Sequence, residues 1–306
     1  MRRILAIVGA TSTGKTTLGE AVAEALGADI VCADARQVFR ELDMGTGKPT
    51  REERGARPHH LFDALSLGDQ PSAGWYAREA RDLCERLFAQ GRTPVLVGGS
   101  GLYLQALQRG LHAEPPRDAA VRTRLQQMLQ ADGPQVLHAR LASADPLTAA
   151  RLSPGDSQRI TRALEVYESS GRPMSWWHAQ ERQGALVGEW KVVEVSLGPR
   201  LLAERIATRT HGMFEAGLVE ETRALVTDGR RASLESLQAI GYDESLLLID
   251  GSIDRETAEA RTNLRTRQMA KRQRTWFRHQ MDALRLEGDD GDLARLVKAS
   301  LEHVRG

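Results

Sequence analysis

The chain has 306 residues, of which 41% are hydrophobic, and its 42 Lys and Arg nearly balance its 41 Asp and Glu. This composition excludes a disordered chain, and two cysteines are too few for a disulfide scaffold. No apolar run approaches the roughly 18 residues of a membrane span, and the apolar run at residues 4–8 is too short for a signal peptide. We therefore expect a soluble, cytoplasmic protein with no membrane partner.

Short apolar runs alternate with helical patterns in the first part of the chain. Residues 4–8, 28–32 and 93–97 are typical of strands buried in a parallel sheet. Residues 18–26 and 75–88 have the apolar spacing of amphipathic helices. This alternation predicts an α/β fold in which helices cover both faces of a parallel sheet.

Helical patterns dominate after the Pro115-Pro116 pair. The chain then returns to the sheet through an alternating strand pattern at residues 190–197. The helices that we expect on either side of this strand span residues 119–131, 135–142, 147–152, 158–169, 199–215, 218–227, 242–249, 254–280 and 292–304. We predict an α/β core of residues 1–113 and 190–306 with C-terminal helices, interrupted by a helical insertion at 114–189.

A glycine-rich loop follows the first predicted strand and opens the first predicted helix. It matches the phosphate-binding pattern G-x-x-x-x-G-K-[ST] and consists of Gly9, Ala10, Thr11, Ser12, Thr13, Gly14, Lys15 and Thr16. Glycines allow backbone N–H groups to surround a phosphate at the start of a helix. Lys15 adds a positive charge, and the Thr16 hydroxyl is a candidate Mg²⁺ ligand. This P-loop predicts a phosphate-bearing substrate.

A carboxylate follows the second predicted strand, at Asp34. The strand at 93–97 ends in glycines and Ser100, without the acidic residue that usually holds Mg²⁺ in P-loop NTPases. The carboxyl ends of parallel strands meet at one edge of a sheet, so Asp34 should lie near the P-loop. It could accept a proton from a substrate that attacks a phosphate-bearing donor, or it could simply cap a turn.

The predicted helix at 254–280 carries an uneven charge distribution. Residues 261–281 contain seven Arg or Lys and no Asp or Glu. Such a segment can be a solvated helix face, or it can bind the phosphates of a nucleic acid.

Several motifs in a fixed order resemble the isopentenyl-tRNA transferase family, the tRNA dimethylallyltransferases. The resemblance covers residues 3–280. The motifs are the P-loop, DARQ from Asp34, GTGKP from Gly45, HHL from His59, GGSGLY from Gly98, QRITRALEVY from Gln158, AIGY from Ala239 and TRQMAKRQRTWFR from Thr266. The chain departs from the family's common pattern at Ala35 and Phe39, where Ser and Tyr are usual, and neither change removes a reacting group.

The resemblance implies a P-loop NTPase-like fold and a defined reaction. A dimethylallyl group would pass from dimethylallyl diphosphate to N6 of the adenosine 3′-adjacent to the anticodon, in tRNAs that read codons beginning with U. Asp34 takes the family's position of the base, Arg209 that of an arginine on the diphosphate, and Ser100 that of a threonine near the substrate base. Mg²⁺ would be the cofactor, bound at Thr16, and we expect a monomer.

The resemblance also implies where tRNA binds. Asp34, Ala35, Arg36 and Gln37 would line the pocket of the extruded adenosine together with Ser100. The remaining residues implied to contact the anticodon stem-loop are Arg122, Gln158, Arg159, Ile160, Thr161, Arg162, Gln238, Gly241, Tyr242, Lys271, Arg272, Arg274 and Arg278.

Two other functions remain open from the sequence. A small-molecule P-loop kinase would use Asp34 to activate a hydroxyl, although a 75-residue helical insertion is unusual there. A nucleotide-gated RNA-binding regulator would need no carboxylate. We interpret the His59-His60 pair as loop packing rather than a metal site, Trp176-Trp177 as packing in the insertion rather than RNA stacking, and both cysteines as small hydrophobic residues.

Overall fold

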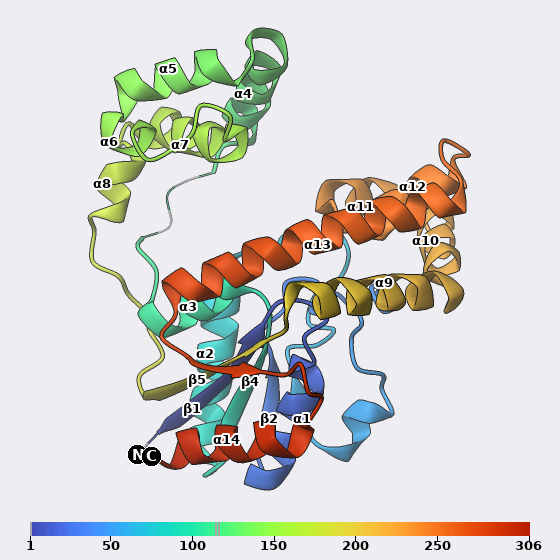
Figure 1. Ribbon diagram of the computed structural model, residues 1–306. Coiled ribbons are helices and arrows are strands. Elements are labelled where there is room, and N and C mark those ends of the chain that lie inside the picture. The colour runs from blue at the N-terminus through green and yellow to red at the C-terminus, as the bar shows by residue number, and fades with distance from the viewer. Residues whose placement is uncertain (1, 114, 116) are drawn as a thin grey trace. The chain divides into compact units, whose positions relative to one another are not determined.

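The computed structural model describes residues 2–113, 115 and 117–306. The chain divides into two compact units, one made of Met1–Gln108 with Leu186–Gly306 and the other of Arg109–Ala185. The first unit is an α/β unit built on a parallel sheet, and the second is helical (Figure 1). The predicted α/β fold class is confirmed. In the described part of the chain no helix is long and apolar enough to cross a membrane.

The sheet has six strands in the order β3-β2-β4-β1-β5-β6, and every neighbouring pair is parallel. The strands are β1 (Arg3–Gly9), β2 (Asp29–Cys32), β3 (His59–His60), β4 (Pro94–Gly98), β5 (Glu189–Ser196) and β6 (Leu284–Glu287). The central strands are buried along nearly their whole length, which explains why they are continuous apolar runs. The functional loops follow the carboxyl ends of β1, β2 and β4.

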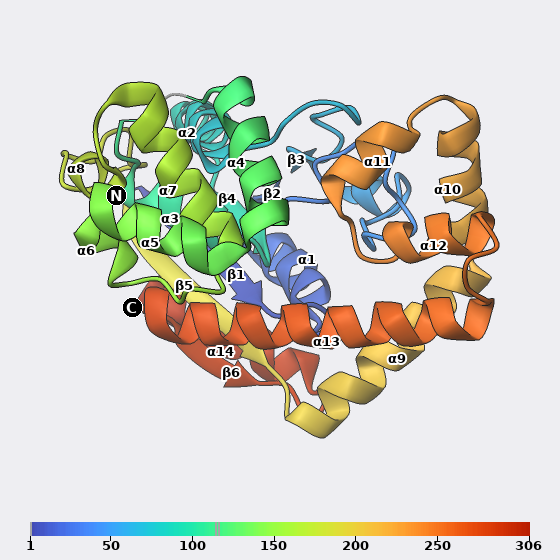
Figure 2. The same ribbon diagram turned by 90° about the horizontal axis from the view of Figure 1, so that it is seen from above.

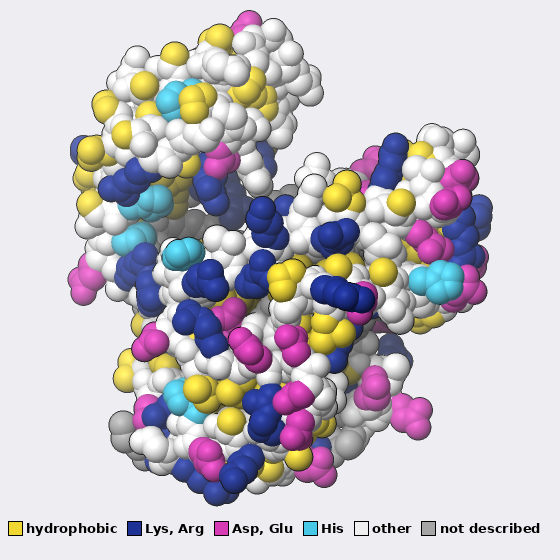
Figure 3. All heavy atoms as spheres, viewed as in Figure 1, with side chains coloured by type: hydrophobic (Ala, Val, Ile, Leu, Met, Phe, Trp, Pro, Cys, Tyr) yellow, Lys and Arg dark blue, Asp and Glu magenta, His cyan; other side chains and the backbone are white. Residues whose placement is uncertain are grey.

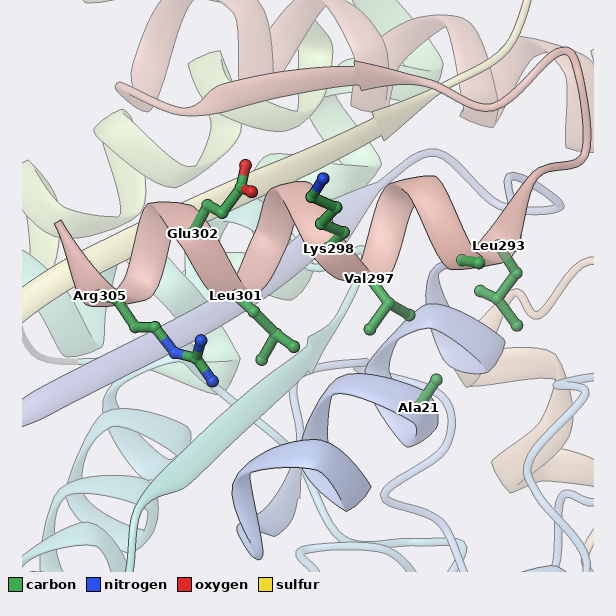
Figure 4. Close-up of a pocket in the computed structure, with 8 residues that line it drawn as sticks. Ala21, Leu293, Val297, Lys298, Leu301, Glu302 and Arg305 are labelled. Atoms are coloured by element: carbon green, nitrogen blue, oxygen red, sulfur yellow. The ribbon is translucent and has the colours of Figure 1, made fainter.

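Helices cover both faces of the sheet. On one face, α2 (Ala73–Ala89) and α3 (Gly101–Arg109) pack on side chains such as Ile4 and Leu96. On the other face, α1 (Lys15–Leu26) and α14 (Leu293–Arg305) pack on the alternate side chains, such as Leu5. A shallow groove between α1 and α14 is lined mainly by apolar side chains, and no predicted site residue lines it (Figure 4).

The remaining helices of the α/β unit form a second layer of structure beside the P-loop. They are α9 (Pro199–Glu215), α10 (Leu218–Thr227), α11 (Arg231–Leu237), α12 (Tyr242–Ile249) and α13 (Arg255–Gln280). Together with the segment after β2, which includes the short helix η1 (Glu53–Ala56), they surround a core around Phe39 and Tyr242. The long helix α13 lies alongside α9 and also contacts β1 (Figures 1 and 2).

The helical unit has its own apolar core, around Leu125, Leu141 and Leu164. Its helices are α4 (Ala119–Asp132), α5 (Pro134–Ala144), α6 (Pro146–Ala149), α7 (Ser157–Ser170) and α8 (Met174–His178). One carboxylate links three of these helices: Glu168 of α7 pairs with Arg124 of α4 and Arg140 of α5.

Several expectations about elements were wrong. His59-His60 is not a loop but the edge strand β3, in which His59 and His60 bond to the carboxylates of Glu20 and Asp29. The region after β5 is not purely helical, because the short strand β6 extends the sheet beside β5. The helices α3, α8 and α11 were also missed, since each is short and α3 begins directly after a run of glycines.

Candidate active site

The P-loop has the backbone that its sequence predicts. Gly9 has a φ of 153° and a Cβ there would lie 2.5 Å from the Val195 carbonyl oxygen, so only glycine fits. Ser12 and Gly14 also have positive φ angles of 63° and 89°, which turns the loop back to the start of α1. The Ser12 hydroxyl is buried without a hydrogen-bond partner among the described residues, a polar atom left unpaired inside the loop.

Lys15 lies inside this loop rather than in solvent. Its Nζ donates a hydrogen bond of 3.3 Å to the Ala10 carbonyl oxygen. Burial lowers the pKa of the Lys15 ammonium to about 8, with Asp34 opposing the shift and Arg209 adding to it. These couplings place the Asp34 carboxylate within electrostatic reach of the P-loop lysine, although the two residues follow different strands.

Arg209 of α9 is anchored on the P-loop. Its guanidinium donates to the Thr11 hydroxyl at 2.8 Å and to the Thr46 carbonyl oxygen at 2.9 Å. A Cβ at Gly47 would overlap this guanidinium, so the GTGKP motif supplies the space in which Arg209 lies. Burial lowers the pKa of Arg209, and the Asp34 carboxylate opposes that shift. Arg209 thus joins the P-loop to the segment after β2.

A second arginine of α9, Arg205, lies one turn before Arg209. Its Nη1 is 3.8 Å from the Cβ position of Gly14, and it forms no ion pair with any residue that the structure describes. Sequence reasoning assigned no role to Arg205; the signal that could have found it is its i,i+4 spacing to Arg209, which puts both on one helix face.

Asp34 is held by hydrogen bonds of its own segment and of the loop after β4. Its Oδ1 accepts from the Arg36 backbone N–H at 2.9 Å, and the Ala35 N–H donates to the Ser100 hydroxyl at 2.8 Å. A Cβ at Gly98 would overlap the Ala33 backbone, so glycine permits this close approach of the two loops. Ser100 therefore contacts the backbone next to Asp34 and not its carboxylate.

The other two residues of the predicted adenosine pocket are partly used in internal contacts. Gln37 Nε2 donates to the Thr46 and Gly47 carbonyl oxygens, each at 3.2 Å. The Arg36 guanidinium donates to the Leu237 carbonyl oxygen at 2.8 Å. The structure thus brings Asp34, Ala35, Arg36, Gln37 and Ser100 into one cluster beside the P-loop.

Gln273 of α13 is a site residue that the sequence analysis did not single out. Its Oε1 accepts from the Thr11 backbone N–H at 2.9 Å, and its Nε2 donates to the Gly99 carbonyl oxygen at 3.0 Å. The P-loop and the loop after β4 are therefore bridged by one amide. Gln273 lies in the TRQMAKRQRTWFR motif that begins at Thr266, and its place in that motif is the signal that could have found it.

Most cations of the basic segment of α13 are free of acidic partners. Arg265 pairs with Asp243 and Glu244. No acidic residue in the described chain pairs with Arg261, Arg267, Lys271, Arg272, Arg274 or Arg278. Residues 267, 271, 274 and 278 follow helical spacing and form one stripe, and Figure 3 shows dark blue side chains along this part of the surface. We call these four residues the basic stripe.

The predicted contacts at residues 238–242 require a correction. Tyr242 is completely buried, and its hydroxyl donates to Glu221 at 2.5 Å and accepts from the Gly45 N–H at 3.1 Å. Its side chain therefore holds the segment after β2 and cannot contact RNA in this conformation. Gly241 is buried as well, whereas Gln238 is exposed, with a left-handed φ of 51°.

The predicted RNA contacts of the helical unit fall into two groups, exposed and buried. Gln158, Arg159 and Arg122 are exposed. Ile160 and Thr161 are buried in the core of this unit, so direct contact of their side chains with RNA is excluded in this conformation. Arg162 is half-buried and pairs with the buried Glu165 at 3.1 Å.

The residues expected to play no chemical role behave in different ways. Cys32 and Cys84 are free and buried, and burial raises the pKa of the Cys84 thiol to about 12. Trp177 is half-buried and donates to the Ser170 hydroxyl, whereas Trp176 is 40% exposed with Arg172 over its ring. The interpretation as core packing therefore fits Trp177 better than Trp176.

A divalent metal at this site would have few protein ligands. No cluster of three or more His, Cys, Asp or Glu in the described part of the chain could hold an ion. The Thr16 hydroxyl, in the first turn of α1, makes no hydrogen bond to another described residue. This donor set fits Mg²⁺, which commonly keeps its waters and binds through substrate phosphates with few protein ligands.

Comparisons with known proteins agree with these observations. A family model described as IPP transferase matches residues 37–280, and one described as isopentenyl transferase matches residues 2–64. The tRNA dimethylallyltransferase of Koribacter versatilis is 40% identical over 305 residues, which cover 99% of this chain and 98% of the relative. That of Halorhodospira halophila is 43% identical over 289 residues, covering 94% and 93%.

Solved structures match over the same length. The tRNA isopentenylpyrophosphate transferase of Bacillus halodurans has a TM-score of 0.71 at 30% identity, covering 100% of this chain and 97% of that one. A eukaryotic dimethylallyltransferase acting on tRNA has a TM-score of 0.77 at 25% identity, covering 96% and 75%. The fold and site define a P-loop α/β transferase in which Asp34 follows β2 at the same edge of the sheet as the phosphate loop. Within that class, the chain belongs to the IPP transferase family, which confirms the resemblance found in the sequence.

Proposed function

We propose that the chain is a tRNA prenyltransferase that moves a dimethylallyl group from dimethylallyl diphosphate to N6 of the adenosine 3′-adjacent to the anticodon. Its tRNAs would be those that read codons beginning with U. The observation that carries the proposal is the pair of hydrogen bonds by which Arg209 joins Thr11 of the P-loop to Thr46 of the segment after β2, the segment that carries Asp34. The Asp34 charge also opposes the lowering of the pKa of both Lys15 and Arg209. A proton acceptor thus lies beside a site built for a diphosphate. The names of its relatives state dimethylallyl transfer to tRNA, which supports the proposal.

The donor side of the site is suited to a diphosphate leaving group. When the bond between the allylic carbon and oxygen breaks, its electron pair goes to the diphosphate, whose negative charge grows. Lys15, Arg209 and the P-loop N–H groups are fixed around the position where that charge develops. Arg205 adds a further cation beside Gly14.

The acceptor side needs a proton acceptor, because the N6 lone pair of adenine is delocalised into the ring and is a weak nucleophile. As N6 bonds to the allylic carbon, one of its protons passes to the Asp34 carboxylate and then to solvent. Ser100 keeps the Asp34 segment in place through Ala35. The adenosine must leave its stack to reach this carboxylate, with Gln37 and Arg36 beside it.

Mg²⁺ would neutralise diphosphate charge and would be held by Thr16 together with oxygens of the substrate. The protein's own contribution is to orient the diphosphate through the P-loop backbone, Lys15 and Arg209. Loss of the Thr16 hydroxyl should therefore weaken Mg²⁺ binding and raise the Mg²⁺ concentration that turnover needs, while leaving the Asp34 step intact.

We assign tRNA binding to two surfaces. One is the exposed set Arg122, Gln158 and Arg159 on residues 114–189, which we propose as the tRNA-binding insertion. The other is the basic stripe with Arg272, whose unpaired cations can neutralise RNA phosphates. A monomeric state and a cytoplasmic location stay predictions from the sequence.

The kinase alternative is not favoured. The relatives of this chain are named as transferases acting on tRNA. In addition, β4 ends at Gly98 without an acidic residue that could hold the metal of a nucleotide. A kinase would moreover leave the unpaired cations of α13 without a role.

The test combines purified protein with Mg²⁺, labelled dimethylallyl diphosphate and an anticodon stem-loop carrying the target adenosine. We expect label in the RNA. Asp34→Asn keeps the acceptor oxygen for the Arg36 N–H but removes the base, so turnover should fall by about 10²–10⁴-fold. Asp228→Asn, at an exposed position, is the matched control and should retain full turnover.

Two outcomes would contradict the proposal. An unlabelled stem-loop with the unmodified protein would remove the prenyl-transfer reaction, and transfer of phosphate from ATP to an alcohol would favour the kinase. Equal turnover of Asp34→Asn and Asp228→Asn would leave the reaction standing but take the role of base away from Asp34.

A further inference from the structure

We propose that Gln273 is a positioning residue that couples RNA binding on α13 to diphosphate binding in the P-loop. The proposal rests on the function proposed above, because it assigns the diphosphate to the P-loop and the RNA to the basic stripe. It concerns the side chain of one amide residue between two cations, the exposed Arg272 and the half-buried Arg274.

Gln273 is joined to the diphosphate side of the site through Thr11. The Thr11 backbone N–H donates to Gln273 Oε1 at 2.9 Å, while the Thr11 hydroxyl accepts from Arg209 at 2.8 Å. Thr11 is thus hydrogen-bonded to two helices: its backbone N–H bonds to α13 and its hydroxyl bonds to α9. A shift of α13 changes the position of Thr11 relative to Arg209.

Gln273 is also joined to the acceptor side, through the loop after β4. Its Nε2 donates to the Gly99 carbonyl oxygen at 3.0 Å. The next residue, Ser100, accepts from the Ala35 N–H beside Asp34 at 2.8 Å. The Gln273 amide is therefore connected to the Ala35 backbone, beside Asp34, by two hydrogen bonds and the peptide link between Gly99 and Ser100.

The packing around this amide is close enough to transmit small movements. A Cβ at Gly99 would overlap Gln273, and a Cβ at Gly101 would overlap the Trp276 ring. The two glycines let α13 lie directly on the loop after β4. Close-packed contacts of this kind leave no free volume in which a helix displacement could be absorbed.

The chemistry of the contact explains why an amide is needed. One partner is a donor, the Thr11 N–H, and the other is an acceptor, the Gly99 carbonyl, so the bridging side chain must accept at one end and donate at the other. A carboxylate accepts only, and a thioether does neither well. Asn has the right groups but is one methylene shorter than Gln.

Coupling between two ligands is reciprocal, so each ligand must raise the affinity for the other by the same factor. We expect pyrophosphate to tighten binding of the stem-loop by about 10-fold in the unmodified protein, within the usual range of such couplings. Calorimetry of stem-loop binding with and without Mg²⁺-pyrophosphate measures this factor. It needs no turnover.

Gln273→Met keeps the side-chain length and removes both hydrogen bonds, so the coupling factor should fall to about 1. The affinity for the stem-loop alone should stay within about 2-fold, because the basic stripe is unchanged. Turnover should fall about 10-fold or more, and the KM for the RNA at saturating donor should rise, because the donor no longer tightens RNA binding. Gln268→Met, exposed on the same helix, is the matched control and should keep both values.

Gln273→Glu provides a second test of the coupling if the Met variant folds poorly. It keeps the acceptor for Thr11 but places a negative charge beside the diphosphate and an acceptor against the Gly99 carbonyl. It should lower pyrophosphate affinity and abolish coupling, without lowering stem-loop affinity more than about 2-fold.

Three results would overturn the proposal: no coupling in the unmodified protein, coupling retained in Gln273→Met, or an equal loss in Gln268→Met. Failure of the proposed function would look different. Then no label would reach the RNA, although coupled binding of pyrophosphate and stem-loop would still be measured.

Discussion

Arg209 of α9 donates a hydrogen bond of 2.8 Å to the hydroxyl of Thr11 in the P-loop. The two residues are far apart in the chain, yet this contact fixes a cation at the edge of the phosphate-binding loop. A half-buried guanidinium that also bonds to Thr46 has a single orientation, since its two terminal nitrogens are directed at different partners. The site is therefore arranged before its substrate arrives.

Arg209→Lys should keep the charge but lose this two-point geometry. An ammonium can replace one of the two hydrogen bonds and not both, so charge on the leaving diphosphate is stabilised less well. We expect turnover to fall by about 10²-fold, measured with labelled donor and stem-loop. Arg200→Lys, an exposed position of the same helix, should match the unmodified protein; similar losses in both variants would refute a specific role for Arg209.

Pyrophosphate binding should weaken as the pH rises through the pKa of Lys15. That pKa is lowered to about 8 in the free protein. The charged ammonium binds the anion, and the bound anion raises the pKa, so binding takes up a proton above about pH 8 and loses affinity there. Calorimetry at pH 7 and pH 9 in buffers of different ionisation enthalpy detects this proton.

Lys15→Met provides the comparison for this pH effect. The titration of pyrophosphate itself is common to both proteins, so the difference in pH dependence isolates the lysine. The variant should bind pyrophosphate more weakly at pH 7, with no extra proton uptake near pH 8. The same uptake in both proteins would assign the titration to another group.

The basic stripe should control how strongly RNA binding depends on salt. Lys271→Gln and Arg274→Gln each remove one cation that no described acid neutralises. Each should reduce the slope of log affinity against log salt by about 0.7–0.9 if the residue contacts a phosphate. Lys298→Gln, on α14 in the groove shown in Figure 4, removes a charge of the same sign and should leave the slope unchanged.

Tyr242→Phe separates a structural role from an RNA contact. The variant loses the hydrogen bonds of the hydroxyl to Glu221 and Gly45, and burial already raises the pKa of Glu221. We expect the free energy of unfolding in urea to fall by about 2 kcal/mol, with stem-loop affinity unchanged at low temperature. A loss of RNA affinity without a loss in the free energy of unfolding would show that Tyr242 does contact RNA. Tyr167→Phe, at an exposed position, controls for the tyrosine change itself.

Much of the α/β unit could be predicted because its signals are local. The runs at β1, β2 and β4 are apolar and bounded by glycines, and the P-loop carries its own spacing. Asp34 could be placed near that loop because the carboxyl ends of parallel strands share one edge of the sheet. The α9, α10 and α12 helices began and ended where their periodicity predicted.

The contacts that complete the site could not be predicted from local patterns. Gln273 belongs to the motif that begins at Thr266, but its role could not be predicted because it depends on which loop α13 crosses. Ile160 and Tyr242 belong to motifs whose residues we expected to act together. Successive residues on a helix are rotated by about 100°, so one motif can place some side chains in solvent and others in the core. Strand β6 was missed since Leu284–Glu287 is short and polar, and only its pairing with β5 defines it.

The sheet order has a consequence for how the protein is made. β1 leaves the ribosome first, but its neighbour β5 begins only at Glu189, and the residues that brace the P-loop, Arg209 and Gln273, emerge later still. A nascent chain therefore carries the phosphate loop without the groups that make it selective. The P-loop therefore acquires its bracing hydrogen bonds only in the last stage of synthesis.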